Sequence, residues 1–304
     1  MKNFDSLLAV VSWEERFLSG MILNFENNFF KKVVLFEFEG YEDRNKGNLD
    51  IILDLCKINN VEVSIYSLNF ATPKENWFLL KKTIIVENVG VDVLLDFTTM
   101  PRETIWSILF FLEQVASLID YVYYRPSSYN DVWLSRDPSS PRLLYKMSGI
   151  SELGRPTLLV VFAGHDYQRL SYLINRVEPF KVILASQGDE KNEEVVTKCI
   201  TDFDGNLDIN RISFDNLSEA KFYSQIAEII EENLAEFNIV IASLGPKFSA
   251  IPIYQINRAY PETALCYVPC KEFNELYSVG IDKNNISYGT LTIPKRKYQL
   301  AKDY

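Results

Sequence analysis

Two threonines, an aspartate and an arginine interrupt one of the most apolar stretches of the chain. In VDVLLDFTTMPRETIW (91–106) a strand pattern ends in a polar turn and a helical pattern follows; the polar residues of this turn are Asp96, Thr98, Thr99 and Arg102. The amides and the positive dipole end of a helix favour an anion, and Arg102 adds a matching charge. The turn therefore predicts a site for a nucleotide or another anion. We expect Thr98 or Thr99 to cap this helix. The structural alternative is that Asp96 and Thr98 only cap the helix and Arg102 pairs with Glu103 or Glu113.

A second turn later in the chain has the same order of residue types. NIVIASLGPKFSA (238–250) runs from an apolar strand through Ser243, Gly245 and Lys247 into the next helical pattern. It again supplies a hydroxyl, a cation and a glycine that permits close approach of the backbone. Two such turns in equivalent positions favour a binding site over two unrelated helix caps.

Charged residues also follow the first strand of each half, in VSWEERF (11–17) and GHDYQRL (164–170). Acids at strand ends can perform acid–base or metal-assisted chemistry with Mg²⁺ or Mn²⁺; the candidates are Glu14, Glu15, Asp96, His165 and Asp166. The alternatives are that the acids complement a helix dipole and that the lone histidine is structural. Further candidate ligand contacts at strand ends are Ser12, Arg16, Tyr124, Tyr129 and Arg169.

The stretch YVYYRPSSYNDVWLSRDPSSPRLLY (121–145) is rich in tyrosine and arginine and contains three prolines. It cannot be a regular helix, and we expect a rigid aromatic loop after a short strand at 121–124. Such a loop is suited to stacking on a nucleobase. The alternative is a brace that packs two halves of the chain together.

These polar turns need a scaffold, and the rest of the sequence supplies one. Apolar β-branched runs such as VVLFEFEG (33–40) and KVILAS (181–186) alternate with helical patterns throughout, which is typical of βαβ units around a parallel sheet. In such sheets ligands bind beyond the carboxyl ends of the strands. The predicted fold therefore collects the polar turns at one edge of each sheet.

The chain also repeats itself. VSWEERF matches GHDYQRL, LLDFTTMPRE matches VIASLGPKFS, and YVYYRPSSYNDVWLS matches ALCYVPCKEFNELYS, in the same order; the last pair shares a proline, an Asn–acid pair and a terminal serine. We therefore predict an α/β fold of two tandem Rossmann-like units, each a mainly parallel sheet flanked by helices and related by internal duplication. Glycines and a proline place the boundary near residue 150, giving domains 1–150 and 151–304.

Composition narrows the class of function. The chain of 304 residues is 47% hydrophobic and 24% charged, as expected for a globular protein. Its net charge of −10 opposes nucleic-acid binding except through a local basic patch. No apolar run approaches a membrane span. The four cysteines form no disulfide framework, so we expect reduced, buried thiols, no metal site and a cytoplasmic location; zinc at the C-x3-C pair Cys266 and Cys270 is the alternative.

Common catalytic signatures are missing: the sequence contains no GxGxxG, GxxxxGK[ST], GxSxG or HExxH motif. The turn LLDFTTMPRETIW instead resembles the ligand-contacting turn of CARF-like Rossmann domains, and ASLGPKFSA is similar to a degenerate Gly-Thr-Lys turn of that superfamily. The fused pair is also similar to SAVED domains. The resemblance implies a sensor of cyclic oligonucleotides in prokaryotic antiviral defence, with Thr98, Thr99, Arg102, Gly245 and Lys247 lining one cleft. It also implies a partner effector, since no residues remain to build one.

Three classes of function follow. The leading hypothesis is a nucleotide-binding sensor or regulatory subunit of an antiphage defence system that acts through a partner effector. The second is a hydrolase on nucleotides or nucleic acid, such as a phosphodiesterase, nuclease or nucleosidase, which uses the strand-end acids. The third is a structural subunit of a larger complex. Assembly into a homo-oligomer is a separate expectation, compatible with each class.

Overall fold

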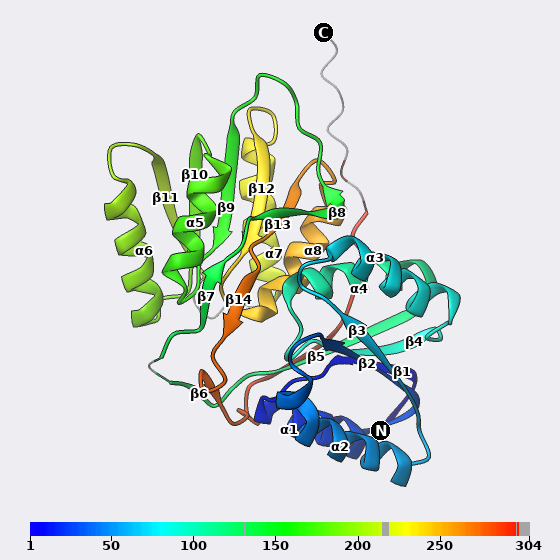
Figure 1. Cartoon of the computed structure of the whole chain (residues 1–304). Coiled ribbons are helices and arrows are strands. Elements are labelled where there is room, and N and C mark those ends of the chain that lie inside the picture. The colour runs from blue at the N-terminus through cyan, green and yellow to red at the C-terminus, as the bar shows by residue number, and fades with distance from the viewer. Residues whose placement is uncertain (131, 215–218, 296, 298–304) are drawn as a thin grey trace. The chain divides into compact units, whose positions relative to one another are not determined.

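The computed structural model describes residues 1–130, 132–214, 219–295 and 297, and within it the chain divides into two compact units (Figure 1). Unit 1 comprises Met1–Val132 and Asn274–Leu291; unit 2 comprises Trp133–Phe273 and Thr292–Tyr304. The chain therefore passes from one unit to the other three times. The boundary near residue 150 remains a prediction about the duplicated sequence, whereas the compact units are interleaved along the chain.

Unit 1 is built on a six-stranded sheet in the order β16-β5-β4-β1-β2-β3. All neighbours are parallel except β16, which pairs antiparallel with β5. Residues of the central strands are buried on both faces, which explains their continuous apolar runs. The strands are β1 (Lys2–Val10), β2 (Asn28–Phe38), β3 (Glu62–Leu68), β4 (Asp92–Asp96), β5 (Leu118–Tyr124) and β16 (Ile286–Thr290).

Helices cover both faces of this sheet (Figure 1). On one face, α1 (Glu15–Asn27) and α2 (Glu42–Ile58) bury side chains that include Phe17 and Cys56 against β1 and β2. The other face carries α3 (Pro73–Lys81), the π-helical turn η1 (Lys82–Val86) and α4 (Arg102–Val115). The ring of Trp77 in α3 lies 5.0 and 4.6 Å from the rings of Phe110 and Phe111 in α4. These contacts hold α3 against α4; the sequence pattern does not predict α3.

Unit 2 repeats the design with the order β8-β13-β12-β9-β10-β11, and again only the β8 strand is antiparallel to its neighbour. The strands are β8 (Arg142–Ser148), β9 (Thr157–Phe162), β10 (Lys181–Ser186), β11 (Asp208–Ser213), β12 (Asn238–Ser243) and β13 (Ala264–Tyr267). The helices are α5 (Tyr167–Val177), α6 (Glu190–Phe203), α7 (Glu219–Asn233), the 3-10 turn η2 (Lys247–Ser249) and α8 (Ala250–Ala259). The matching strand orders confirm two Rossmann-like units. None of the helices in the described residues is long and apolar enough to cross a membrane.

The two halves of the sequence exchange strands. The β8 strand follows the first half but pairs with β13 of unit 2, and β16 follows the second half but pairs with β5 of unit 1. Two small ladders repeat this exchange: β6 (Ser128–Tyr129) pairs with β15 (Ser278–Val279), and β7 (Ser135–Pro138) pairs with β14 (Cys270–Phe273). We call 133–148 and 274–291 the exchanged segments. The strand expected at 121–124 is the end of β5. The aromatic loop expected after it is wrong for much of its length, because distant strands supply hydrogen-bond partners for β6, β7 and β8.

A buried carboxylate fastens β16 to unit 1. The Asp120 side chain is fully buried, and it accepts hydrogen bonds from Lys2 Nζ at 2.7 Å, Tyr288 Oη at 2.6 Å and Thr290 Oγ1 at 2.5 Å. Burial alone would raise the pKa of this carboxyl, but the hydrogen bonds from Lys2, Thr290 and Tyr288 outweigh it and hold the pKa below its ordinary value. The ionised form of Asp120 is therefore the form that stabilises unit 1.

We expect Asp120→Asn to lower the free energy of unfolding by about 2 kcal/mol, because hydrogen bonds to a buried charge are lost. Since the folded pKa is depressed, this contribution is complete above the ordinary aspartate pKa of about 3.9 and disappears as pH falls through the lower folded value. Urea unfolding at pH 7 and pH 3 measures both effects. Lys31→Ala removes the exposed partner of Asp5 and serves as the control, with little change expected. Equal stability of Asp120→Asn and wild type at pH 7 would contradict this role of Asp120.

Candidate functional site

Each sheet has one place where the strand order reverses, between β1 and β4 in unit 1 and between β9 and β12 in unit 2. The helices that follow these neighbouring strands cover opposite faces of the sheet, and in open α/β sheets the carboxyl edge at such a switch point is the usual place for a ligand. The polar turns singled out in the sequence lie at these edges. They form one candidate site per unit.

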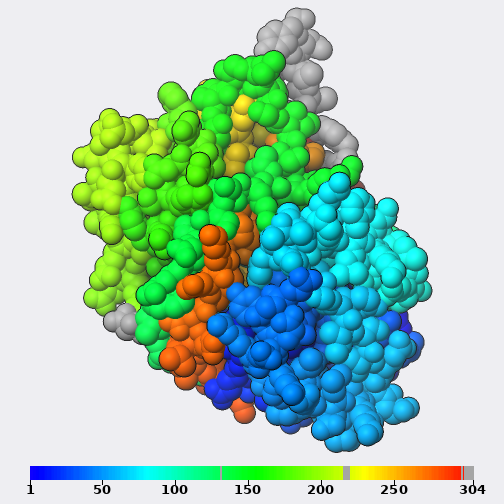
Figure 2. All heavy atoms as spheres, in the orientation of Figure 1, coloured from blue at the N-terminus to red at the C-terminus, as the bar shows by residue number. Residues whose placement is uncertain are grey.

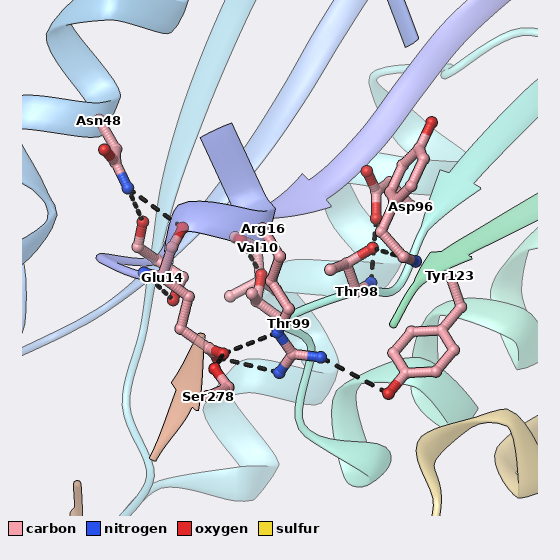
Figure 3. Close-up of polar contacts among 11 residues, drawn as sticks. Val10, Glu14, Arg16, Asn48, Asp96, Thr98, Thr99, Tyr123 and Ser278 are labelled. Carbon is pink, nitrogen blue, oxygen red and sulfur yellow. Dashed lines mark hydrogen bonds and ion pairs between the residues drawn. The ribbon is translucent and has the colours of Figure 1, made fainter. Parts of the chain in front are cut away.

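In unit 1 the turn after β1 is organised around a buried guanidinium (Figure 3). Arg16 lies in the first turn of α1 and is 8% exposed. Its Nε donates to Glu14 Oε2 at 2.7 Å and its Nη2 to Glu14 Oε1 at 3.2 Å, a bidentate pair. Its Nη1 reaches the hydroxyl of Tyr123 at 3.5 Å, and the ring of Tyr123 lies beneath the guanidinium at 6.0 Å.

Two further residues hold the Glu14 turn in place. Ser278, on an exchanged segment, donates its hydroxyl proton to Glu14 Oε2. Asn48 of α2 donates to the carbonyl oxygens of Ser12 at 2.8 Å and Glu14 at 3.3 Å (Figure 3). Burial alone would lower the pKa of Arg16, but the attraction of Glu14 outweighs it and the pKa is raised, so the guanidinium stays charged.

The turn after β4 is tied to its neighbouring strands by its own side chains. Thr99 Oγ1 donates to the carbonyl of Val10 at 2.7 Å and so links the ends of β4 and β1. Thr98 Oγ1 accepts the backbone N–H of Tyr124 at 3.1 Å and links β4 to β5. The α4 helix has Pro101 at its N-cap and no side-chain cap. The expectation that Thr98 or Thr99 caps this helix is therefore wrong: both hydroxyls hold strand ends together.

Asp96 is buried beneath this turn. Its Oδ1 accepts the backbone N–H of Thr98 at 3.0 Å, and its Oδ2 accepts Asn24 Nδ2 at 2.8 Å. Tyr124 in turn donates to Asn24 Oδ1 at 2.7 Å, and burial raises the pKa of that tyrosine. Both carboxylate oxygens of Asp96 therefore serve a buried network that fixes the strand ends.

Unit 2 contains a corresponding arginine in a different electrostatic setting. Arg169 lies in the first turn of α5, is 5% exposed, and has its guanidinium 5.9 Å from the ring of Tyr267. Its Nη2 donates to the carbonyl of Val268, but its buried Nε has no hydrogen-bond partner. Among the described residues, no carboxylate lies within ion-pair distance of this guanidinium. Asp166 at the N-cap is engaged elsewhere: it accepts the backbone N–H of Arg169 at 3.0 Å and the hydroxyl of Ser135.

Other predicted residues of unit 2 lie around this edge. His165 Nε2 is 3.0 Å from Asp189 Oδ1, at the start of α6. The hydroxyls of Ser243 and Ser249 are 2.8 Å apart. Gly245 meets Gly164 across the switch point, since a β-carbon on Gly245 would lie 2.4 Å from the oxygen of Ala163 and one on Gly164 2.3 Å from that of Leu244. These glycines let the turns after β9 and β12 touch.

The remaining predicted site residues are less closely connected with the two buried arginines. Glu15 is exposed, one residue beyond the Glu14 carboxylate that pairs with Arg16. Arg102 and Lys247 are half-buried at the starts of α4 and η2. Tyr129 lies on β6, where its ring is 5.0 Å from that of Tyr277 on an exchanged segment. Within the described residues, no three His, Cys, Asp or Glu side chains converge as a metal-binding group.

Four residues of the site are not among the predicted ones: Tyr123, Asn48, Ser135 and Ser278. The two serines carry a signal in the sequence, because each is the terminal serine of the matched stretches YVYYRPSSYNDVWLS and ALCYVPCKEFNELYS. In the structure each donates to the acid at the N-cap of the helix after the first strand. The two serines that match in the sequence therefore make matching hydrogen bonds in the structure.

Comparison with known proteins indicates a fold but does not identify a family. The sequence matches no family model and no curated protein. Among solved structures, the chain is similar to a type III CRISPR defence DNA nuclease activated by cyclic oligoadenylate, with a TM-score of 0.56, 9% sequence identity and coverage of 84% of this chain. The aligned region spans 63% of that nuclease. At such low identity this likeness concerns the fold alone, and it agrees with the Rossmann-like fold expected from the sequence.

Two other structures align over most of the chain. They are the cytoplasmic domain of a prokaryotic cation chloride cotransporter, with 10% identity and coverage of 90% of this chain and 98% of that one, and a ketoreductase of phoslactomycin biosynthesis from Streptomyces sp. HK803, with 7% identity and coverage of 85% and 64%. Their TM-scores of 0.30 and 0.24 are too low to indicate a shared fold.

The contact between the two glycine turns gives a test of the unit 2 site. We expect Gly245→Ala to lower the free energy of unfolding by about 2 kcal/mol or more, since the new methyl group meets backbone that cannot rotate away. Gly47→Ala in α2 meets nothing within 4 Å and should raise stability by about 1 kcal/mol. Urea denaturation of both variants measures the contrast. Unchanged stability of Gly245→Ala would mean that the turns after β9 and β12 do not touch.

Proposed function

We propose that this protein is a nucleotide-binding sensor of prokaryotic antiviral defence that acts through a partner effector. Its ligand is an anionic nucleotide, with cyclic oligoadenylate the first class to test. Binding takes place at the carboxyl edges of the sheets, where the turns after the first and fourth strands of each unit meet.

The observation that carries the proposal is the setting of Arg169. A buried charge without an ionic partner is costly, and it is stabilised when an anion supplies the missing interaction. Arg169 is buried, its Nε lacks an acceptor, and no described carboxylate pairs with its guanidinium. A phosphate oxygen is a suitable acceptor, because guanidinium and phosphate geometries match.

The two units differ in whether a ligand must displace a carboxylate from the buried arginine. In unit 1, Arg16 is already neutralised by Glu14, so a ligand there has to replace the carboxylate. In unit 2, no such exchange is required. Arg102 and Lys247, at the starts of the helical turns after β4 and β12, add the second cation of each site.

The likeness to a nuclease activated by cyclic oligoadenylate supports this choice of ligand class. That nuclease shares the fold of this chain over the aligned region, and the predicted ligand turns lie at the switch points of that fold. The strand-end acids give less support to hydrolysis, because Asp96 and Asp166 each use both carboxylate oxygens in buried hydrogen bonds.

Isothermal titration of the purified protein with cyclic tetra-adenylate and cyclic hexa-adenylate tests the proposal, with linear oligoadenylate as comparison. We expect binding that weakens on the order of tenfold or more in Arg169→Lys, which keeps the charge but loses the planar fork. Arg102→Ala and Lys247→Ala should weaken binding as well. Lys57→Ala, at the exposed far end of α2, should leave affinity unchanged.

Absence of heat and of any thermal stabilisation with every nucleotide would refute the proposal. Binding that is equally tight in Arg169→Lys and wild type would refute the assignment of the site to Arg169. Because lysine retains the charge and most of the side-chain volume, a folded variant is expected, and its circular dichroism spectrum provides the control.

A further inference from the structure

The exchanged segment 274–291 is attached to unit 1 in an unusual way. Of its side chains only Tyr277 and Leu291 are buried, each 9% exposed, and its orange part lies on the surface seen in Figure 2. The central strands β1 and β4, by contrast, bury most of their residues. Beyond Tyr277, Leu291 and Ile281, the last of which is partly buried against the core of unit 1, little apolar surface holds the segment, so it can open at less free-energy cost than the unit as a whole.

Hydrogen bonds hold the segment instead, and those of the side chains of Tyr288 and Thr290 to the buried carboxylate of Asp120 are part of them. The β16 strand pairs with β5 from Ile286 opposite Tyr124 to Thr290 opposite Asp120. Nearer the start of the segment, Ser127 N–H donates to the carbonyl of Val279 at 3.0 Å. An exposed ion pair between Arg44 and Glu275 at 2.9 Å adds little in water.

One side-chain contact connects the segment with the candidate site. The Ser278 hydroxyl donates to Glu14 Oε2, and the same oxygen accepts Nε of Arg16 at 2.7 Å (Figure 3). A single carboxylate therefore serves the buried cation and the exchanged segment together. Any anion that binds the guanidinium of Arg16 also repels the carboxylate of Glu14, which accepts the hydrogen bond from Ser278.

We propose that segment 274–291 is the output element of unit 1, released when an anionic ligand displaces Glu14 from Arg16. The inference rests on the proposed function and specifies its regulation. In the ligand-free protein, Glu14 holds Ser278 and the segment stays paired. In the bound protein, phosphate oxygens occupy the guanidinium, Glu14 turns away, and the edge of β5 is exposed to a partner.

Unit 2 provides an internal comparison. Its exchanged segment 133–148 carries Ser135, which donates to Asp166 at the N-cap of α5. Asp166 is not paired with the guanidinium of Arg169, so ligand binding there does not compete for the carboxylate. Release is therefore specific to segment 274–291, although both segments are held by a serine and an acid.

Hydrogen–deuterium exchange of the full-length, ligand-free protein tests the link without any ligand. We expect Ser278→Ala to raise exchange of the amides of 278–291 on the order of tenfold, because a hydrogen bond to a charged group is lost. Exchange in β1 and β4 should not change. Ser278→Thr retains the hydroxyl and should restore slow exchange, and Ser135→Ala should accelerate 133–148 alone.

A second arm adds cyclic tetra-adenylate. In wild type, bound cyclic tetra-adenylate should accelerate exchange of 278–291, and in Ser278→Ala the additional change should be small. Binding without altered exchange in this segment, or identical exchange in Ser278→Ala and wild type, would overturn the proposed release. If cyclic tetra-adenylate does not bind at all, the proposed function loses its first ligand, and the ligand-free comparison still decides whether Ser278 controls the segment.

Discussion

A buried guanidinium needs acceptors on several sides, and this need organises the carboxyl edge of both sheets. In unit 1 the acceptors are a bidentate carboxylate from Glu14 and the hydroxyl and ring of Tyr123. In unit 2 a carbonyl and a tyrosine ring are the partners of Arg169. The helix after the first strand, the end of the last parallel strand and an exchanged segment all meet at the turn that carries the arginine. The parallel sheets give these elements a common edge, and the arginine sets where they converge.

The two units share this arrangement but differ in its charge. Both arginines are in the first turn of a helix, both lie about the same distance from a tyrosine ring, and a serine donates to the N-cap acid in each unit. Only Arg16 has a carboxylate as its partner. The same backbone therefore holds one neutralised and one uncompensated cation, which is a physical basis for unequal behaviour of two otherwise similar sites.

The sequence predicts much of this fold because its signals are local. Continuous apolar runs identify β1, β2 and β10 as buried strands, and the repeated polar turns locate the carboxyl edges of the sheets. The sequence does not predict β8 and β16, the antiparallel partners of β13 and β5. Their residues are largely exposed, and nothing in their pattern indicates pairing with a strand distant in sequence. The contacts of Thr98 and Thr99 are not predicted for the same reason. Helix capping is judged from neighbouring residues, whereas the hydrogen bonds of Thr98 and Thr99 reach Tyr124 and Val10.

The exchange of strands also has a consequence for how the chain is made. A ribosome releases β5 long before it releases β16, and all of the second half is synthesised between them. The first sheet therefore emerges with an unpaired edge, a state in which a growing chain is vulnerable to wrong strand pairing. The pairing that closes this edge joins residues more than 160 positions apart, as the contact of Asp120 with Tyr288 shows. Such distant contacts form slowly, so completion of unit 1 is a late event in the biogenesis of the protein, and unit 2 acquires its own edge strand from residues made before it.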